Sequence, residues 1–104
     1  MEHFGYVMAT RSLVEEKRKV GFMYREKGEG DDSGWRFFTG EEDQAYVDNP
    51  ENIKIYDIQT ILDIDKGIHP YLNSVVNSAF ERDPETGCFK MAEDFGFEAE
   101  IGEA

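Results

Sequence analysis

The chain has 104 residues, and its 23 Asp and Glu outnumber its 11 Lys and Arg, which gives a formal net charge of −12 at pH 7. This excess of carboxylates excludes simple binding of nucleic acids, which depends on Lys and Arg that displace counterions from phosphates, and it disfavours anionic membrane surfaces. With 39% apolar and 13% aromatic residues, the chain has enough apolar surface to form one compact domain rather than remain disordered.

The first third of the sequence predicts three strands. Residues 5–10, 20–26 and 35–39 are rich in aromatic and β-branched residues, which favour strands. The polar loop 27–34 contains three glycines together with Asp and Ser, so it predicts a hairpin between the second and third strands. Residues 11–19 carry four bases and little apolar content, and they fit either a helical turn or an irregular connector.

A capping pattern follows the third strand. Thr39 stands three residues before Glu42, the spacing at which a Thr hydroxyl and a Glu carboxylate satisfy each other's backbone N–H groups at the start of a helix. The pattern therefore predicts a short helix over residues 41–47, with an acidic first turn that suits the helix dipole. Pro50 ends it, because the residue before a proline is disfavoured in helical geometry.

The second half of the sequence predicts short strands and a helix. Ile53 and Ile55 predict a brief strand, and Asp57 is a suitable N-cap for a helix over residues 57–64, in which Ile58, Ile61 and Leu62 share one face. Residues 78–82 predict a further strand. After a turn at residues 83–87, Phe89 and Met91 suggest a returning strand.

These elements predict an α+β fold with a single domain, in which an antiparallel sheet is covered by two or three short helices. We expect the domain to span residues 5–82. Residues 83–104 form an acidic C-terminal extension, in which Phe95, Phe97, Ala99 and Ile101 alternate with polar residues and glycine, and this pattern fits an edge strand as well as a solvated tail.

The sequence has no strong catalytic or metal-binding motif. His3, His69 and Cys88 are far apart, and the segment 63–74 resembles a calcium loop but has its glycine one residue early and Ser74 in place of the acidic twelfth ligand. The glycines of the 27–34 loop are not followed by the Lys-Ser or Lys-Thr pair of a phosphate-binding loop. We therefore expect no metal, no cofactor and no enzymatic activity.

The single cysteine, Cys88, excludes an internal disulfide and a zinc site with four cysteine ligands, and we expect it to be an unreactive strand residue. Residues 1–5 lack the basic and apolar segments of a secretory signal, and no apolar run approaches the roughly 20 residues that span a bilayer. These features predict a cytoplasmic protein.

The aromatic residues at 35–38 have two interpretations. Trp35 and the pair Phe37 and Phe38 are expected to pack in the core, but one ring displayed at the surface would serve as an anchor for a partner. Adjacent strand residues point to opposite faces, so Phe37 and Phe38 cannot enter one core layer. Either both faces of the sheet are covered, or one ring is displayed.

The charges are unevenly distributed along the chain. Residues 11–27 hold six of the eleven bases, whereas residues 41–65 hold eight acids and the single base Lys54. An acidic half opposite a more basic segment would steer association with a basic protein. Alternatively, the negative charge only keeps the protein soluble.

Six segments of the sequence resemble those of a bacterial protein family: Gly5-Tyr-Val-Met-Ala-Thr-Arg-Ser12, Val20-Gly-Phe-Met-Tyr-Arg-Glu26, Ser33-Gly-Trp-Arg-Phe-Phe-Thr-Gly40, Asp48-Asn-Pro-Glu-Asn-Ile53, Thr60-Ile-Leu-Asp-Ile-Asp65 and Ser78-Ala-Phe-Glu-Arg82. The chain resembles the immunity protein 33 family over Gly5 to Arg82. The resemblance implies a small single-domain α+β protein that acts as an immunity protein of a polymorphic toxin system, and it brings no catalytic residues.

Charge and resemblance together predict a non-enzymatic protein that binds and occludes a basic toxin domain, such as a nuclease. The expected binding surface consists of five acids, Glu41, Glu42, Asp43, Asp48 and Glu51, with Trp35 or Tyr46 as a central aromatic anchor. The alternative is a stand-alone or regulatory domain that binds a small ligand in a pocket beside the sheet.

Overall fold

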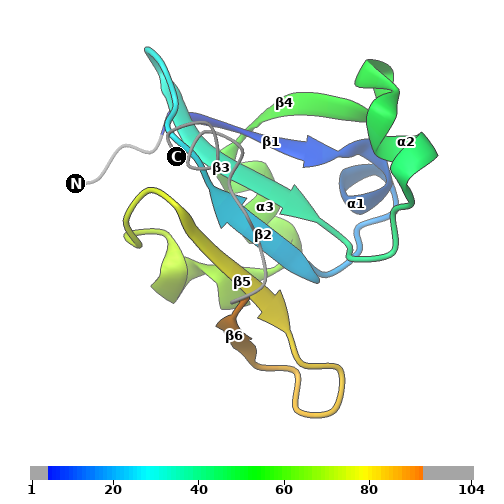
Figure 1. The fold of residues 1–104 in the computed structure, drawn as a ribbon, viewed down its shortest axis with the longest axis vertical. Coiled ribbons are helices and arrows are strands. Elements are labelled where there is room, and N and C mark those ends of the chain that lie inside the picture. Colours follow the sequence, from blue (N-terminus) through cyan, green and yellow to red (C-terminus); the bar gives the residue numbers. More distant parts are fainter. Residues whose placement is uncertain (1–4, 93–104) are drawn as a thin grey trace, which may run out of the picture.

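Six strands form one mixed sheet in the order β4-β1-β3-β2-β5-β6 in the computed structural model, which describes residues 5–92 (Figure 1). The strands are β1 (Tyr6–Thr10), β2 (Phe22–Arg25), β3 (Asp32–Phe38), β4 (Ile53–Asp57), β5 (Ser78–Arg82) and β6 (Phe89–Met91). The helical elements are α1 (Arg11–Glu15), α2 (Gln44–Asp48), α3 (Ile58–Ile64) and the 3₁₀ segments η1 (Pro50–Asn52) and η2 (Lys66–Tyr71). The predicted single-domain α+β fold is confirmed.

The sequence had led us to expect an antiparallel sheet, but the sheet is mixed. Strands β1 and β3 run parallel, while β1–β4, β2–β3, β2–β5 and β5–β6 are antiparallel pairs. The chain leaves β1 through α1 and returns in β2, and the β2–β3 hairpin then places β3 between β2 and β1. Alternation of apolar residues identifies strands but contains no information about the direction of a neighbouring strand, which is why this prediction was wrong.

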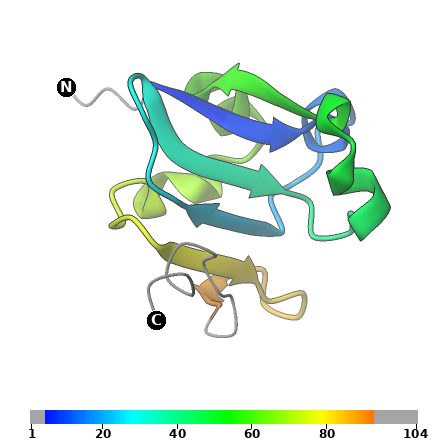
Figure 2. The same cartoon turned by 45° about the horizontal axis from the view of Figure 1, so that its top comes forward.

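One face of the sheet carries the hydrophobic core. Alternate residues of β3, Trp35 and Phe37, lie on this face and are fully buried. The core cluster contains Val7, Ala9, Leu13, Val20, Met23, Trp35, Phe37, Ile61, Ile68, Leu72 and Phe80. The helices α1 and α3 cover the same face together with η2, so the buried side chains lie between the sheet and one helical layer (Figure 2).

The predicted helix over residues 57–64 is confirmed as α3. The Asp57 carboxylate accepts a hydrogen bond from Gln59 N at 2.8 Å, as expected of an N-cap, and Ile61 is buried against the sheet. The segment 11–19, which the sequence left open, forms a helix of five residues, α1, that inserts Leu13 into the core. Its remaining residues form the connection to β2.

The sheet continues beyond residue 82. Strand β6, suggested by Phe89 and Met91, pairs with β5, and Arg82 lies opposite Phe89 in this pair. The Arg82 guanidinium is 4.3 Å from the centre of the Phe89 ring, which favours the pairing. The alternating residues 95–101 lie outside the described residues.

Candidate protein-binding site

The loop that follows β3 does not start a helix at residue 41. Helix α2 begins at Gln44, and its N-cap is Asp43, whose carboxylate accepts from Tyr46 N at 2.8 Å. The Thr39 hydroxyl accepts from Glu41 N at 3.1 Å, which closes a turn and not a helical cap. The predicted helix start was wrong, because Asp43 caps the helix instead. One half of the predicted capping box does form, since the Glu42 carboxylate accepts from Thr39 N, but the Thr39 hydroxyl accepts from Glu41 N and not from Glu42 N.

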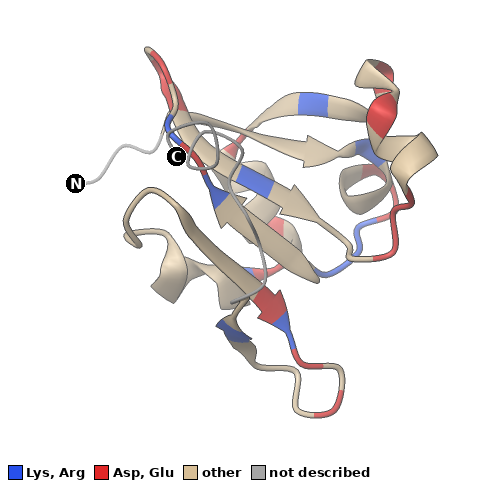
Figure 3. Cartoon of the chain, in the orientation of Figure 1, with Lys and Arg blue, Asp and Glu red and all other residues tan. Residues whose placement is uncertain are grey.

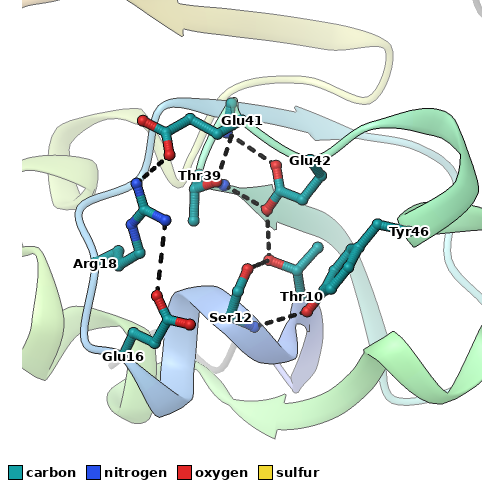
Figure 4. Close-up of polar contacts among 9 residues, drawn as sticks. Thr10, Ser12, Glu16, Arg18, Thr39, Glu41, Glu42 and Tyr46 are labelled. Atoms are coloured by element: carbon teal, nitrogen blue, oxygen red, sulfur yellow. Dashed lines mark hydrogen bonds and ion pairs between the residues drawn. The ribbon is translucent and has the colours of Figure 1, made fainter.

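The Glu42 carboxylate holds the loop after β3 in place through hydrogen bonds within the protein. Its Oε2 accepts from Thr39 N at 2.8 Å and from the Thr10 hydroxyl at 2.7 Å, and its Oε1 accepts from Gly40 N at 3.0 Å (Figure 4). Burial raises the pKa of Glu42, but the hydrogen bonds from Thr10 and from the backbone outweigh burial and hold the pKa below its ordinary value. Glu42 therefore stays ionised and satisfied within the protein, and its carboxylate is not directed at a partner.

Tyr46 joins α2 to the start of α1. Its hydroxyl oxygen accepts from Ser12 N at 3.0 Å, and the Ser12 hydroxyl lies 3.5 Å from Thr10 Oγ1, so the network is continuous with Glu42 (Figure 4). Tyr46 is half-buried. The structure thus places the predicted anchor partly inside the protein, where it positions α2.

The basic segment lies beside the acidic one, and this corrects the expectation of an acidic half opposite a basic segment. The Arg18 guanidinium forms an ion pair with Glu41 and lies 3.7 Å from Glu16 (Figure 4). The hydrogen bond with Glu41 raises the pKa of Arg18. Lys19 Nζ is 4.0 Å from the Asp65 carboxylate. Part of the positive charge of residues 11–27 is therefore neutralised locally.

Four of the five predicted acids are exposed at one corner of the molecule, which we call the acidic corner: Glu41, Asp43, Asp48 and Glu51. They lie on the loop before α2, on α2 itself and on η1 (Figure 3). Asp48 accepts from Gln44 Nε2 at 2.8 Å within α2, and Asn49 caps η1 by accepting from Glu51 N at 3.0 Å. Asp48 and Glu51 thus stand on short capped elements, Asp43 is the cap of α2, and Glu41 lies in the loop before it.

Trp35 is not part of this surface. Its side chain is fully buried, and its indole Nε1 donates to Leu72 O at 3.1 Å. The ring stacks on Phe37 with centroids 5.8 Å apart. As predicted, Phe37 and Phe38 lie on opposite faces, but it is the odd-numbered residues of β3 that face the helices, so Trp35 belongs to the core and cannot anchor a partner.

A groove lies on the second face of the sheet, beside α2, with a volume of about 550 Å³. Three aromatic rings form its floor: Phe38 lies 6.2 Å from Phe22 and 5.8 Å from Tyr24, between ring centroids. The groove was not predicted from the sequence. The alternation of Phe22 and Tyr24 in β2 predicts that the two rings share a face of the sheet, but it does not distinguish a groove from the core. The loop 39–43 separates the groove from a smaller hollow of about 230 Å³ lined by Arg18 and Tyr46.

Within residues 5–92, no group of three or more His, Cys, Asp and Glu side chains is arranged to hold a metal ion. None of the described helices has the length and apolar character that crossing a lipid bilayer requires.

Comparison with known proteins identifies the family. No curated protein and no solved structure matches the chain. A family model, the immunity protein Imm33 domain, matches residues 7–93, which include every strand and helix described above except Tyr6, the first residue of β1. Immunity proteins generally act without enzymatic activity, through a protein partner, the toxin that they neutralise. The chain belongs to the Imm33 family of immunity protein domains.

Proposed function

We propose that this protein neutralises a cognate toxin by binding it through the acidic corner, without catalysing a reaction. Membership of the Imm33 family supports an immunity-type role. The observation that favours this surface is the hydrogen-bond network of Glu42, Thr10 and Tyr46, which holds the loop and α2 against the strand ends. Carboxylates on a fixed support lose little conformational entropy on binding, so more of their interaction energy appears as affinity.

The expected mechanism is occlusion. Exposed carboxylates of the acidic corner would occupy a basic site on the toxin, such as the phosphate-binding surface of a nuclease, and would also accelerate the encounter. The half-buried Tyr46 and Val47 supply apolar contact area in the middle of the acids. The proposal includes a cytoplasmic location, which agrees with the single exposed cysteine, Cys88.

A second candidate function, binding of a small ligand, has one observation in its favour. The groove on the second face has a volume within the range of ligand sites, and it combines aromatic walls with polar groups at its edge. It adjoins the acidic corner through Glu41 and Val47, which line it. A ligand site here would therefore share residues with the proposed protein-binding surface.

Affinity capture followed by co-expression tests the proposal. The tagged protein is used to capture partners from its native cell extract at low and at high salt, and the gene of each captured protein is then expressed alone and together with this chain. We expect a basic protein that is released by salt, stops growth when expressed alone, and is harmless when co-expressed. If every captured protein is harmless when expressed alone, the immunity role is contradicted.

A further inference from the structure

Strand β4 forms one edge of the sheet, and among the described residues it pairs with β1 alone (Figure 1). The pairing runs through five consecutive residues, from Ile53 to Asp57. At the opposite edge, β6 has only three residues. An edge strand offers unpaired N–H and C=O groups to a further strand, and β4 is the longer of these two edges.

The hydrogen bonds of β1 determine which backbone groups of β4 face outward. Tyr6 N donates to Asp31 O at 2.9 Å, so the backbone groups of Tyr6 point toward β3. Those of the next residue, Val7, point toward β4, because successive strand residues direct their N–H and C=O groups to opposite sides. Val7 lies opposite Tyr56, which therefore bonds to β1, and the N–H and C=O groups of the neighbouring Ile55 point away from the sheet.

The same alternation turns the backbone groups of Ile53 and Asp57 outward. The Ile53 N–H is already used, since it donates to Pro50 O at the end of η1. The C=O of Ile53, both groups of Ile55 and the N–H of Asp57 have no hydrogen-bond partner among the described residues. The Ile55 side chain is 59% exposed and lies beside Met8 on the second face, so the centre of this edge presents both free backbone groups and an apolar side chain.

The charges around this edge favour a basic partner over a second copy of the chain. Segment η1 leads directly into β4, so Glu51 of the acidic corner lies two residues before the strand begins. Asn52 Nδ2 donates to Tyr46 O at 3.0 Å, which fixes η1 against α2. A second copy would bring a net charge of −12 against another −12, whereas a strand with Lys or Arg beside Glu51 has the complementary charge.

The geometry points to an extended segment of the protein partner that adds to the sheet along β4. Its backbone bonds to the outward groups of Ile55, an apolar side chain of the segment lies beside Ile55 on the second face, and its basic residues reach Glu51. In such strand addition, backbone hydrogen bonds supply affinity and alternate side chains supply specificity. The inference rests on the proposed function in taking the toxin as the partner, and it joins the acidic corner and the β4 edge into one binding surface.

Hydrogen exchange of single backbone amides tests this inference. The full chain, labelled for NMR, is followed alone and in complex with the partner obtained by affinity capture. In the free protein, we expect slow exchange at Lys54 and Tyr56, which bond to β1, and fast exchange at Ile55 and Asp57. In the complex, exchange at Ile55 and Asp57 should slow roughly tenfold or more. Fast exchange at Ile55 in the fully formed complex would overturn the inference and leave the proposed function intact.

Matched substitutions then test the side-chain contact. Ile55→Thr keeps a β-branched residue that suits a strand but removes apolar surface at the centre of the edge. Val75→Thr makes a similar change at a residue that is 75% exposed and lies outside β4. We expect Ile55→Thr to weaken binding of the captured partner roughly fivefold, at low salt and at 0.5 M salt alike because salt does not screen apolar contacts, and Val75→Thr to leave it unchanged.

Two outcomes separate this inference from the proposed function. Unchanged affinity of a folded Ile55→Thr protein for the captured partner contradicts strand addition at β4, whether or not that partner is a toxin. If the captured partner protects the Ile55 amide but is harmless when expressed alone, strand addition is supported and the immunity role is contradicted.

Discussion

Glu42 Oε2 lies 2.7 Å from Thr10 Oγ1 and joins two residues that are 32 positions apart in the chain. Thr10 ends β1 and is fully buried, and Glu42 lies in the loop after β3. Because β1 and β3 are parallel neighbours, their ends meet at one edge of the sheet, and this hydrogen bond connects them. The exposed acids on either side of Glu42 are thereby held in place by a residue that is itself not free to bind.

Removal of this acceptor should destabilise the protein. In Glu42→Ala, the Thr10 hydroxyl and the Thr39 N–H lose their partner, and we expect the free energy of unfolding to fall by about 1–3 kcal/mol. Urea unfolding measures the change. Glu85→Ala, at an exposed turn residue, should stay within about 0.5 kcal/mol of wild type. Equal stabilities of the two variants would show that the Glu42 network does not support the fold.

The same carboxylate should make stability depend on pH. The pKa of Glu42 is lower in the folded protein than in the unfolded chain, so its stabilisation is complete well above the ordinary glutamate pKa of about 4.3 and is lost as the pH falls through the lower folded value. Glu42→Gln should therefore flatten the decline of unfolding free energy in acid. A residual decline is expected from Asp32, because the hydrogen bond from Arg36 lowers its pKa as well. Identical pH profiles for wild type and Glu42→Gln would refute this assignment.

Trp35 provides the test of the core. Trp35→Ala should reduce the free energy of unfolding by about 3–5 kcal/mol, since it empties a fully buried site and removes the hydrogen bond to Leu72 O. Trp35→Phe keeps most of the volume and should be milder. Thermal unfolding distinguishes the two. A Trp35→Ala protein that melts close to wild type would mean that the ring is not in the core.

Asp65 has two basic neighbours whose removal should differ in effect. Arg82 is largely buried and binds the buried Asp65 carboxylate, while the Lys19 side chain is 71% exposed at 4.0 Å from it. Arg82→Met should destabilise the protein by about 3–5 kcal/mol, because it leaves a buried charge without its partner, whereas Lys19→Met should change stability by less than about 1 kcal/mol. Chemical unfolding of both variants measures this difference. Similar losses for the two would indicate that Asp65 is solvated and not held by Arg82.

Local signals in the sequence predicted most of the elements. The strands at residues 5–10, 20–26 and 78–82 and the helix capped by Asp57 depend on alternation, periodicity and a side-chain cap, all of which are local. The parallel β1–β3 pair depends on where the chain returns after α1, and no local pattern specifies that. The pattern at Thr39 predicted the contact of Glu42 with Thr39 N but placed the helix start too early, because Asp43 also accepts from a nearby N–H group and caps α2.

The candidate site was predicted in part. Exposure of Glu41, Asp43, Asp48 and Glu51 follows from their charge and was foreseeable. The inward direction of Glu42 and the burial of Trp35 depend on tertiary contacts. The groove combines β2, β3 and β5, three strands whose order in the sheet the sequence does not specify, so its aromatic floor could not be separated from core residues before the structure was known.

The central claim is that the acidic corner recognises the toxin, and variants that keep the local structure test it best. Asp43→Asn retains an N-cap for α2, and it is combined with Asp48→Asn and Glu51→Gln. The control protein carries the same change of three charges at exposed residues elsewhere: Glu29→Gln, Asp31→Asn and Asp63→Asn. The equal net charge of the two proteins separates a local recognition surface from a general effect of charge.

The decisive measurement is the association rate of each protein with the captured toxin, by stopped-flow at low ionic strength and at 0.5 M salt. We predict that the acidic-corner variant associates roughly tenfold more slowly than wild type at low salt and nearly as fast at 0.5 M, where the Debye length is about 4 Å, while the control stays close to wild type. An acidic-corner variant that associates at the wild-type rate at low salt, or a control that is slowed equally, would contradict the account.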